Sequence, residues 1–188
     1  MRIGIDLDDT VFKYLDEFEL RLYKQAILPK PKNNFDDYSL IIDGVDMHPY
    51  VIEEAQNHIY SSLVPFENAV NTINSLHDEG NEIVFITKRL FSKPYSTIVY
   101  DTEYSLQKYG IKYDELYTLL PTQCKSEFSN NCDLVIDDSP HEVTDYINNH
   151  KDVILFKRPY VDAKQFEGKC DIAYNWLQLA SLIQERKR

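Results

Sequence analysis

The chain has 188 residues, of which 43% are apolar and 27% charged, and its 31 acidic and 20 basic side chains give a formal net charge of −11. This composition is typical of a globular domain with its own core and excludes a disordered or collagen-like chain. Because the acidic balance leaves no basic surface to release counterions from a nucleic-acid backbone, we expect no nucleic-acid polymer as a partner.

Cysteine usage and hydropathy indicate the cellular compartment in which the protein is expected. The three cysteines form no CxxC pair, and their odd number argues against a disulfide framework, so reduced thiols in a reducing cytoplasm are expected. No apolar run approaches the roughly 18 residues of a membrane span, and the early Asp6 indicates no signal peptide. The sequence predicts a soluble cytoplasmic protein with no membrane partner. It sets no oligomeric state and is compatible with a dimer.

Short apolar runs alternate with stretches of helical spacing along the chain. The runs are near-continuous and rich in β-branched or aromatic residues, which is typical of strands buried on both faces of a parallel sheet. The predicted strands are Ile3–Leu7, Ile83–Thr87, Leu134–Ile136 and Val153–Phe156, with Leu116–Leu120 as a weaker fifth. The predicted helices are Asn68–Glu79, Tyr95–Tyr109, the segment after Pro140 and the segment around Trp176. This alternation predicts a doubly wound α/β domain.

The first crossover is much longer than a βαβ unit requires. Two apolar stripes predict helices on either side of an irregular middle at 29–47. The stripes are Val11, Leu15, Phe18 and Leu22, then Ile52, Ala55, Ile59 and Leu63. We interpret 12–64 as a small helical cap inserted into a core formed by 1–11 and 65–188. An insertion there lies over the carboxyl ends of the strands, where doubly wound sheets bind ligands.

The aromatic residues of the insert have two interpretations. They could line a ligand pocket, although for any single one a place in the core of the insert is the more common outcome. They are Phe12, Tyr14, Phe18, Phe35 and Tyr38.

Two carboxylates stand where the first predicted strand ends. In an extended chain Asp6 and Asp8 project to the same side. At about 4 Å two like charges repel by roughly 4 kcal/mol near a protein surface, which a fold tolerates when a cation lies between them or one carboxylate keeps its proton. The alternative is a solvated acidic turn in which Asp9 or Thr10 caps the next helix. Capping does not account for Asp6, which belongs to the apolar run.

A second acidic pair, Asp137 and Asp138, closes the run Leu134–Ile136. An isolated pair of this kind would be interpreted as a helix cap. Two pairs at strand ends instead favour a metal site, and hard carboxylate oxygens with room for water suit Mg²⁺. The histidines and cysteines show no spacing for zinc.

Four more polar side chains, three of them basic, lie at or after strand ends. Thr87 ends the second strong run and precedes Lys88 and Arg89, and Lys125 follows the weaker fifth run. Any one of these cations alone is more often a solvated surface residue. Together with the carboxylates, the set supplies the metal, hydroxyl, cation and nucleophile that phosphoryl transfer needs. The chain has no G-x-x-x-x-G-K motif, which excludes a P-loop kinase.

Four motifs occur in a fixed order: DLDDT at 6–10, FIT at 85–87, the isolated Lys125, and VIDD at 135–138. In order and placement they resemble the motifs of the haloacid dehalogenase (HAD) superfamily of phosphohydrolases, over nearly the whole chain. The resemblance implies a three-layer, Rossmann-like α/β domain with a central parallel sheet and, here, a small helical cap after the first strand.

Within the superfamily, the chain looks most like the small 5′(3′)-deoxyribonucleotidases and their bacterial relatives. This likeness rests on the short cap and on several stretches of the core. They are Val64–Ala69, Asp133–Pro140, Leu155–Tyr160 and Asn175–Trp176.

The resemblance implies a role for each motif residue. Asp6 would attack phosphorus and form an aspartyl-phosphate, and Asp8 would protonate the departing alkoxide and then accept a proton from water. Thr87 would hold a phosphoryl oxygen, and Lys125 would stabilise that charge and Asp6.

The implied metal is Mg²⁺. Its ligands would be the Asp6 carboxylate, the Asp8 backbone carbonyl and Asp137. Asp138 would bind the ion directly or through another ligand.

Two features depart from the relatives. Asp9 stands where they commonly have glycine, and its charge would either tune metal binding or cap a helix. Lys88 and Arg89 follow Thr87 and are candidate phosphate contacts, although an outward salt bridge explains Arg89 equally well.

These observations predict a Mg²⁺-dependent phosphomonoesterase whose partner is a small phosphomonoester, with nucleoside monophosphates, and deoxynucleotides among them, as the leading substrates. The same chemistry on a sugar phosphate is the first alternative, because the cap decides the substrate. A phospho-aspartate receiver domain of a signalling protein is a second, disfavoured by the long insertion and by an acceptor on the first strand. A catalytically silent binding module is a third, disfavoured by the intact motif residues.

Overall fold

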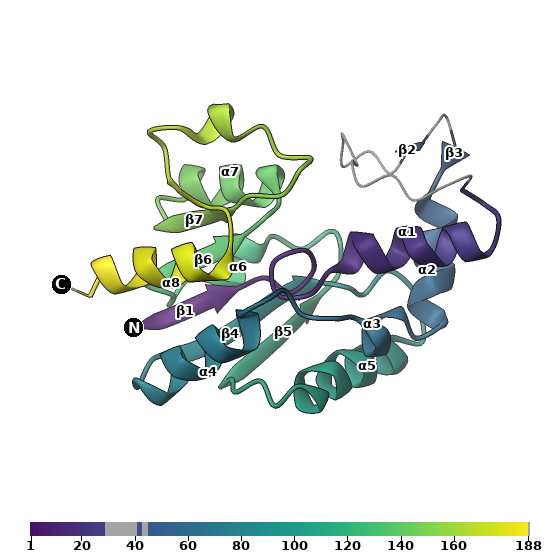
Figure 1. Cartoon of the computed structure of the whole chain (residues 1–188), viewed down its shortest axis with the longest axis horizontal. Helices are drawn as coiled ribbons and strands as arrows, with labels where there is room; N and C mark the ends of the chain where they lie inside the picture. The colour runs from purple at the N-terminus through teal and green to yellow at the C-terminus, as the bar shows by residue number, and fades with distance from the viewer. Residues whose placement is uncertain (29–40, 43–44, 188) are drawn as a thin grey trace.

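A computed structural model describes residues 1–28, 41–42 and 45–187. Its central sheet is parallel and has six strands in the order β5-β4-β1-β6-β7-β8, with a separate antiparallel pair, β2-β3 (Figure 1). The strands are β1 Arg2–Ile5, β2 Ile41–Ile42, β3 Val45–Asp46, β4 Glu82–Lys88, β5 Glu115–Leu119, β6 Leu134–Asp137, β7 Val153–Phe156 and β8 Asp171–Ala173. The helices are α1 Tyr14–Lys24, α2 His48–Gln56, α3 Ile59–Ser62, α4 Ala69–Asp78, α5 Tyr95–Lys108, α6 Lys125–Phe128, α7 Pro140–Asn148 and α8 Trp176–Glu185, with a 3₁₀ turn η1 at Ala163–Phe166.

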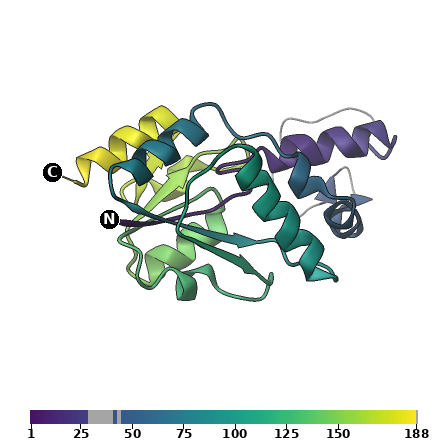
Figure 2. The same ribbon diagram turned by 90° about the horizontal axis from the view of Figure 1, so that it is seen from below.

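Alternate side chains of the central strands pack on opposite faces of the sheet. Ile3, Ile83 and Phe85 pack on the face covered by α4, α5 and α8. Val84 and Val135 pack on the opposite face, with α6 and α7. Figure 2 shows α4 and α8 together on one side of the sheet and α7 on the other. This arrangement confirms the predicted three-layer α/β fold. Because helices cover both faces of the sheet, its central strands are apolar on both faces.

All five predicted strands are present, and the differences are at their ends. β1 ends at Ile5 rather than Leu7, because the chain turns and the backbone N–H groups of Val11 and Phe12 both donate to Leu7 O, at 2.9 and 2.8 Å. The sheet also contains β8, which the sequence analysis missed. That strand has three residues, begins with an exposed Asp171 and buries only Ala173, so it lacks an apolar run.

The insert after β1 leaves and rejoins the core at one place. Lys13 N donates to Val64 O at 3.0 Å, and Phe66 N donates to Val11 O at 2.8 Å. These contacts join the chain just before α1 to the chain just after α3. In Figure 1, α1 and α2 lie beyond the carboxyl ends of the strands.

The predicted helices of the insert are present, with one break. The second apolar stripe forms α2 and α3 rather than one helix, because His58 between them has a left-handed φ of 59°. Much of the predicted irregular middle, including Phe35 and Tyr38, lies outside the described residues. Phe12 and Phe18 are fully buried in the core, as the commoner interpretation of these aromatics predicted.

The indole of Trp176, at the start of α8, supports the loop after β1. Trp176 Nε1 donates to Thr10 O at 3.0 Å, and its ring, 1% exposed, packs on Phe156. We expect Trp176→Phe to lower the free energy of unfolding by about 1–3 kcal/mol, because a buried carbonyl loses its donor. Urea denaturation measures this. Leu177→Ala, at a 62% exposed neighbour, should change it by less than about 0.5 kcal/mol, and equal losses would contradict the assignment.

Candidate active site

The motif residues meet because their strands are neighbours in register. Ile5 pairs with Phe85 in β4 and with Ile136 in β6. Since the three strands are parallel, the residues that follow emerge at the same edge of the sheet. Asp6 and Asp137 therefore come out beside each other. Lys125, the first residue of α6, reaches the same point.

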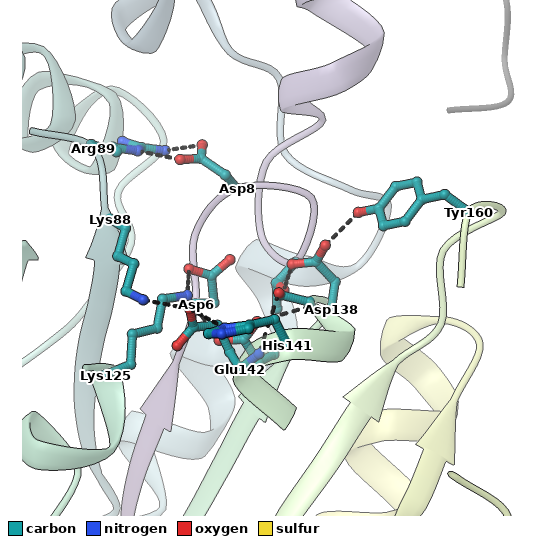
Figure 3. A network of polar contacts seen from close by, with 12 residues as sticks. Asp6, Asp8, Lys88, Arg89, Lys125, Asp138, His141, Glu142 and Tyr160 are labelled. Atoms are coloured by element: carbon teal, nitrogen blue, oxygen red, sulfur yellow. Dashed lines mark hydrogen bonds and ion pairs between the residues drawn. The ribbon is translucent and has the colours of Figure 1, made fainter. Parts of the chain in front are cut away.

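The Lys125 ammonium bridges two carboxylates. Its Nζ donates to Asp6 Oδ1 at 2.5 Å and to Asp137 Oδ2 at 2.8 Å, and all three side chains are buried (Figure 3 shows Lys125 and Asp6). Burial disfavours the charged lysine, but Asp137 and Asp6 outweigh it, so the pKa of Lys125 is raised. The lysine therefore stays charged and fixes both carboxylates.

Three carboxylates form a compact acidic group. Oxygens of Asp6, Asp137 and Asp138 lie within 4.8 Å of one another, and all three residues are buried. Burial raises the pKa of all three carboxyl groups. That of Asp6 rises well above its usual range, that of Asp138 rises to about 7, and that of Asp137 rises as well, while the charge of Lys125 lowers each of them in part. One lysine does not offset three carboxylates, and hard oxygen donors so arranged fit a divalent ion such as Mg²⁺.

Asp138 is held from two sides. Thr10 Oγ1 donates to Asp138 Oδ1 at 3.0 Å, and the hydroxyl of Tyr160 donates to Asp138 Oδ2 (Figure 3). These bonds orient the carboxylate beside Asp137. Partners of this kind commonly orient metal-binding carboxylates.

The Asp6 and Asp8 side chains separate instead of crowding one exit. Asp6 faces Lys125, whereas Asp8 forms a bidentate ion pair with Arg89, with Nε–Oδ2 at 2.8 Å and Nη2–Oδ1 at 2.7 Å (Figure 3). The turn after Ile5 causes this, because the strand no longer extends through Asp8. Asp6 is thus paired with Lys125, which it shares with Asp137, and Asp8 is paired with Arg89, whereas the sequence predicted a cation between Asp6 and Asp8 or a proton kept by one of them.

A cavity of about 330 Å³ opens above these groups. Asp6, Thr87 and Lys125 line it, and so do Tyr14 and Tyr60 of the insert. Thr87 Oγ1 is buried and has no hydrogen-bond partner among the described residues. An unpaired buried hydroxyl is costly, so this atom is available for a bound ligand.

The two basic residues after Thr87 differ in position. Lys88 lines the cavity and forms an ion pair with Glu142 at 2.5 Å. Arg89 is fully buried and does not appear among the described residues that line the cavity. Its salt bridge runs inward to Asp8, whereas the sequence interpretation placed it outward or on phosphate.

Asp9 closes the loop at the start of α1. It has a left-handed φ of 57°, and Leu15 N donates to both of its carboxylate oxygens at 3.3 Å. The positive φ explains why glycine suits this position in relatives. The contacts favour the capping interpretation of Asp9.

Several lining residues were missed from the sequence, among them Tyr60, Tyr160 and Glu142. Glu142 had a signal, since Ser139 and Glu142 form the S-x-x-E pattern of a capping box, and Glu142 N donates to Ser139 Oγ at 3.4 Å. That pattern predicts a helix start and not a cavity wall. The tyrosines come from an insert and a loop whose placement no local pattern encodes.

Comparisons with known proteins agree with this geometry. Residues 3–188 match the model of the 5′ nucleotidase, deoxy (pyrimidine), cytosolic type C protein family. The chain belongs to this family. It is thus a nucleotidase-like phosphoric monoester hydrolase of the HAD superfamily. No curated protein matches the sequence significantly.

Solved structures share the fold of this family member. A predicted phosphoglycolate phosphatase from Haemophilus somnus 129pt is 14% identical, with 97% of each chain covered and a TM-score of 0.64. A predicted phosphatase from Clostridium acetobutylicum is 15% identical, with 98% of each chain covered and a TM-score of 0.63. A haloacid dehalogenase-like hydrolase from Streptococcus pneumoniae is 12% identical, with 97% of each chain covered and a TM-score of 0.61. Within the described residues of the nucleotidase-like chain, no helix has the length and apolar character to cross a membrane.

Proposed function

We propose that the chain is a Mg²⁺-dependent nucleotidase that hydrolyses nucleoside monophosphates, with deoxynucleotides as the leading class, through an aspartyl-phosphate. The observation that carries this proposal is that Asp6, Lys125 and the unpaired Thr87 hydroxyl line the same cavity. These groups supply the nucleophile, the cation and the hydrogen-bond donor that a phosphoryl group requires.

The first half-reaction transfers the phosphoryl group to Asp6. A carboxylate oxygen of Asp6 attacks phosphorus, the bond from phosphorus to the ester oxygen breaks, and Asp8, which enters this step as the carboxylic acid, gives its proton to the departing alkoxide. Thr87 Oγ1 donates to a phosphoryl oxygen. Lys125, already bound to Asp6, offsets the negative charge that develops.

The second half-reaction frees the enzyme. Water attacks phosphorus and gives a proton to Asp8, the bond to Asp6 breaks, and inorganic phosphate leaves. Asp6, Asp137 and the Asp8 carbonyl would hold Mg²⁺, with Asp138 beside them, and the ion would bring the positive charge that lets a phosphate dianion approach these carboxylates.

The remainder of the substrate would lie against the insert. Tyr14 and Tyr60 line the cavity and stack on each other, with ring centroids 5.9 Å apart, and this aromatic surface suits a flat base more than a polar sugar. This favours a nucleotide over a sugar phosphate. Lys88 is paired with Glu142 at the cavity and would meet the substrate there. A cytoplasmic location, as the cysteine pattern of the sequence predicts, is part of this proposal.

A substrate panel with and without Mg²⁺ tests the proposal. We expect phosphate release that requires the metal, with kcat/KM for nucleoside monophosphates at least about tenfold above that for sugar phosphates, a difference of about 1.4 kcal/mol in transition-state binding. Faster hydrolysis of sugar phosphates would establish the alternative substrate class. Stable phosphorylation by acetyl phosphate without turnover would indicate a receiver domain, and no release from any ester would overturn the proposal.

A further inference from the structure

A buried arginine contacts one of the proposed reacting carboxylates from outside the cavity. Arg89 follows the last residue of β4, and its side chain is 0% exposed. Two of its N–H donors go to the two oxygens of Asp8. A bidentate pair of this kind fixes the plane of a carboxylate as well as its position.

The guanidinium is itself held on its other sides. Arg89 Nη1 donates to Thr102 Oγ1 at 3.1 Å, and that hydroxyl donates to Ile98 O within α5. The Arg89 guanidinium carbon lies 4.5 Å from the centre of the Tyr60 ring. The arginine therefore connects the core helix α5 and the insert helix α3 to Asp8, and it has little freedom to move.

We propose that Arg89 is a positioning residue that sets the orientation of the Asp8 carboxylate for proton transfer. This inference rests on the proposed function, in which Asp8 exchanges a proton with the leaving group and with water. A buried arginine this close to the site, with three donors engaged and no described contact with the cavity, is placed to act on Asp8 and not on phosphate.

The contacts of Arg89 also offset the free-energy cost of burying its charge. Taking a guanidinium out of water is unfavourable unless its donors are satisfied. Burial lowers the pKa of Arg89, but the charge and hydrogen bonds of Asp8 more than compensate, so its net direction is upward. Among the described residues, the side-chain hydrogen bonds of Arg89 go to Asp8 and Thr102 alone.

The leaving group distinguishes positioning of Asp8 from a purely structural role. A ribose alkoxide needs a proton to depart, whereas p-nitrophenolate leaves without one. Because kcat/KM covers the steps up to the first irreversible one, it reports on formation of the aspartyl-phosphate. Loss of a well-placed proton donor should therefore lower kcat/KM for a nucleoside monophosphate and spare p-nitrophenyl phosphate.

The test compares Arg89→Lys with wild type on both esters. Lysine keeps the charge but loses the bidentate geometry. We expect kcat/KM for a nucleoside 5′-monophosphate to fall about 100-fold and that for p-nitrophenyl phosphate to fall less than about fivefold. Asp8→Asn should show the same selectivity. The double variant should be within about threefold of Asp8→Asn alone, because the two residues act as a unit.

Two further variants separate this effect from loss of the fold. Thr102→Val removes one anchor of Arg89 without touching Asp8, and it should give a smaller selective loss of about three- to tenfold. Arg21→Lys is the matched control, since Arg21 is bound to Glu17 and Glu54 within the insert. It should leave the ratio of the two kcat/KM values unchanged, and circular dichroism should show that every variant is folded.

The outcomes separate the positioning role of Arg89 from the proposed function of the chain. Equal losses on both esters for Arg89→Lys, or additive losses in the double variant, would overturn the positioning role while wild-type hydrolysis still supported the proposed function. Absence of metal-dependent hydrolysis by wild type would overturn both. A selective loss shared by Arg89→Lys and Asp8→Asn supports the positioning role.

Discussion

Asp6→Asn should lower phosphomonoester turnover by at least about 10⁴-fold, because an amide is not a nucleophile toward phosphorus and no covalent intermediate can form. The fold should persist, since asparagine has the same size and Lys125 retains its contact with Asp137 at 2.8 Å. Rapid acid quench with a radiolabelled substrate measures the result directly. Wild type should carry label on the protein during turnover, and the variant should carry none.

Asp9→Asn provides the matched control for this loss. Asp9 is a buried carboxylate in the same loop, but it accepts from Leu15 N and faces Arg158 at 3.8 Å. Asparagine tolerates the left-handed φ of this position and should keep activity within about tenfold of wild type. Retained turnover in Asp6→Asn would remove the covalent step, and a collapse of activity in Asp9→Asn would show that any change in this loop is inactivating.

Removal of the divalent ion should abolish activity and lower the thermal midpoint. Asp6, Asp137 and Asp138 share one buried site with a single lysine, so an ion that binds there relieves repulsion in the folded state only. At a Mg²⁺ concentration 100 times the dissociation constant, the expected stabilisation is about 2.7 kcal/mol. Thermal denaturation of wild type in EDTA and in a Mg²⁺ series measures this dependence.

Asp137→Asn should abolish most of that dependence. The substitution removes one charged ligand, and we expect the Mg²⁺ concentration for half-maximal activity to rise at least about 100-fold, with a matching loss of the thermal shift. Asp152→Asn, at a half-exposed residue paired with Arg186, should leave the Mg²⁺ response unchanged. An unaltered response in Asp137→Asn would place the ion elsewhere.

The sequence predicted the sheet well because its strands are apolar on both faces. The runs that became β1, β4, β6 and β7 stand out against polar surroundings, and chemistry-bearing residues such as Asp6 and Asp137 follow directly at their ends. Parallel strands bring such ends together, so the cluster of carboxylates could be predicted from the positions of acidic residues directly after apolar runs in the sequence. β8 was missed because a three-residue edge strand with one buried side chain carries no such pattern.

The partners of the site residues were harder to predict. Asp8 and Arg89 are 81 residues apart, and their pairing depends on a tight turn after β1 that the apolar run does not reveal. Arg89 looked like a surface or phosphate-binding cation because a sequence does not show burial. The break at His58 was missed for a related reason, since a left-handed residue between two apolar stripes leaves the helical spacing nearly intact.

The central place of β1 has a consequence for synthesis of the protein on the ribosome. Ile3 leaves the exit tunnel before its two neighbours in the sheet, Ile83 and Leu134. The first strand must therefore wait, with its apolar side chains uncovered, until β4 and β6 have been translated. Such long-range pairing is slow and exposes the nascent chain to aggregation. Early binding of a chaperone to the amino-terminal segment would protect it during that interval.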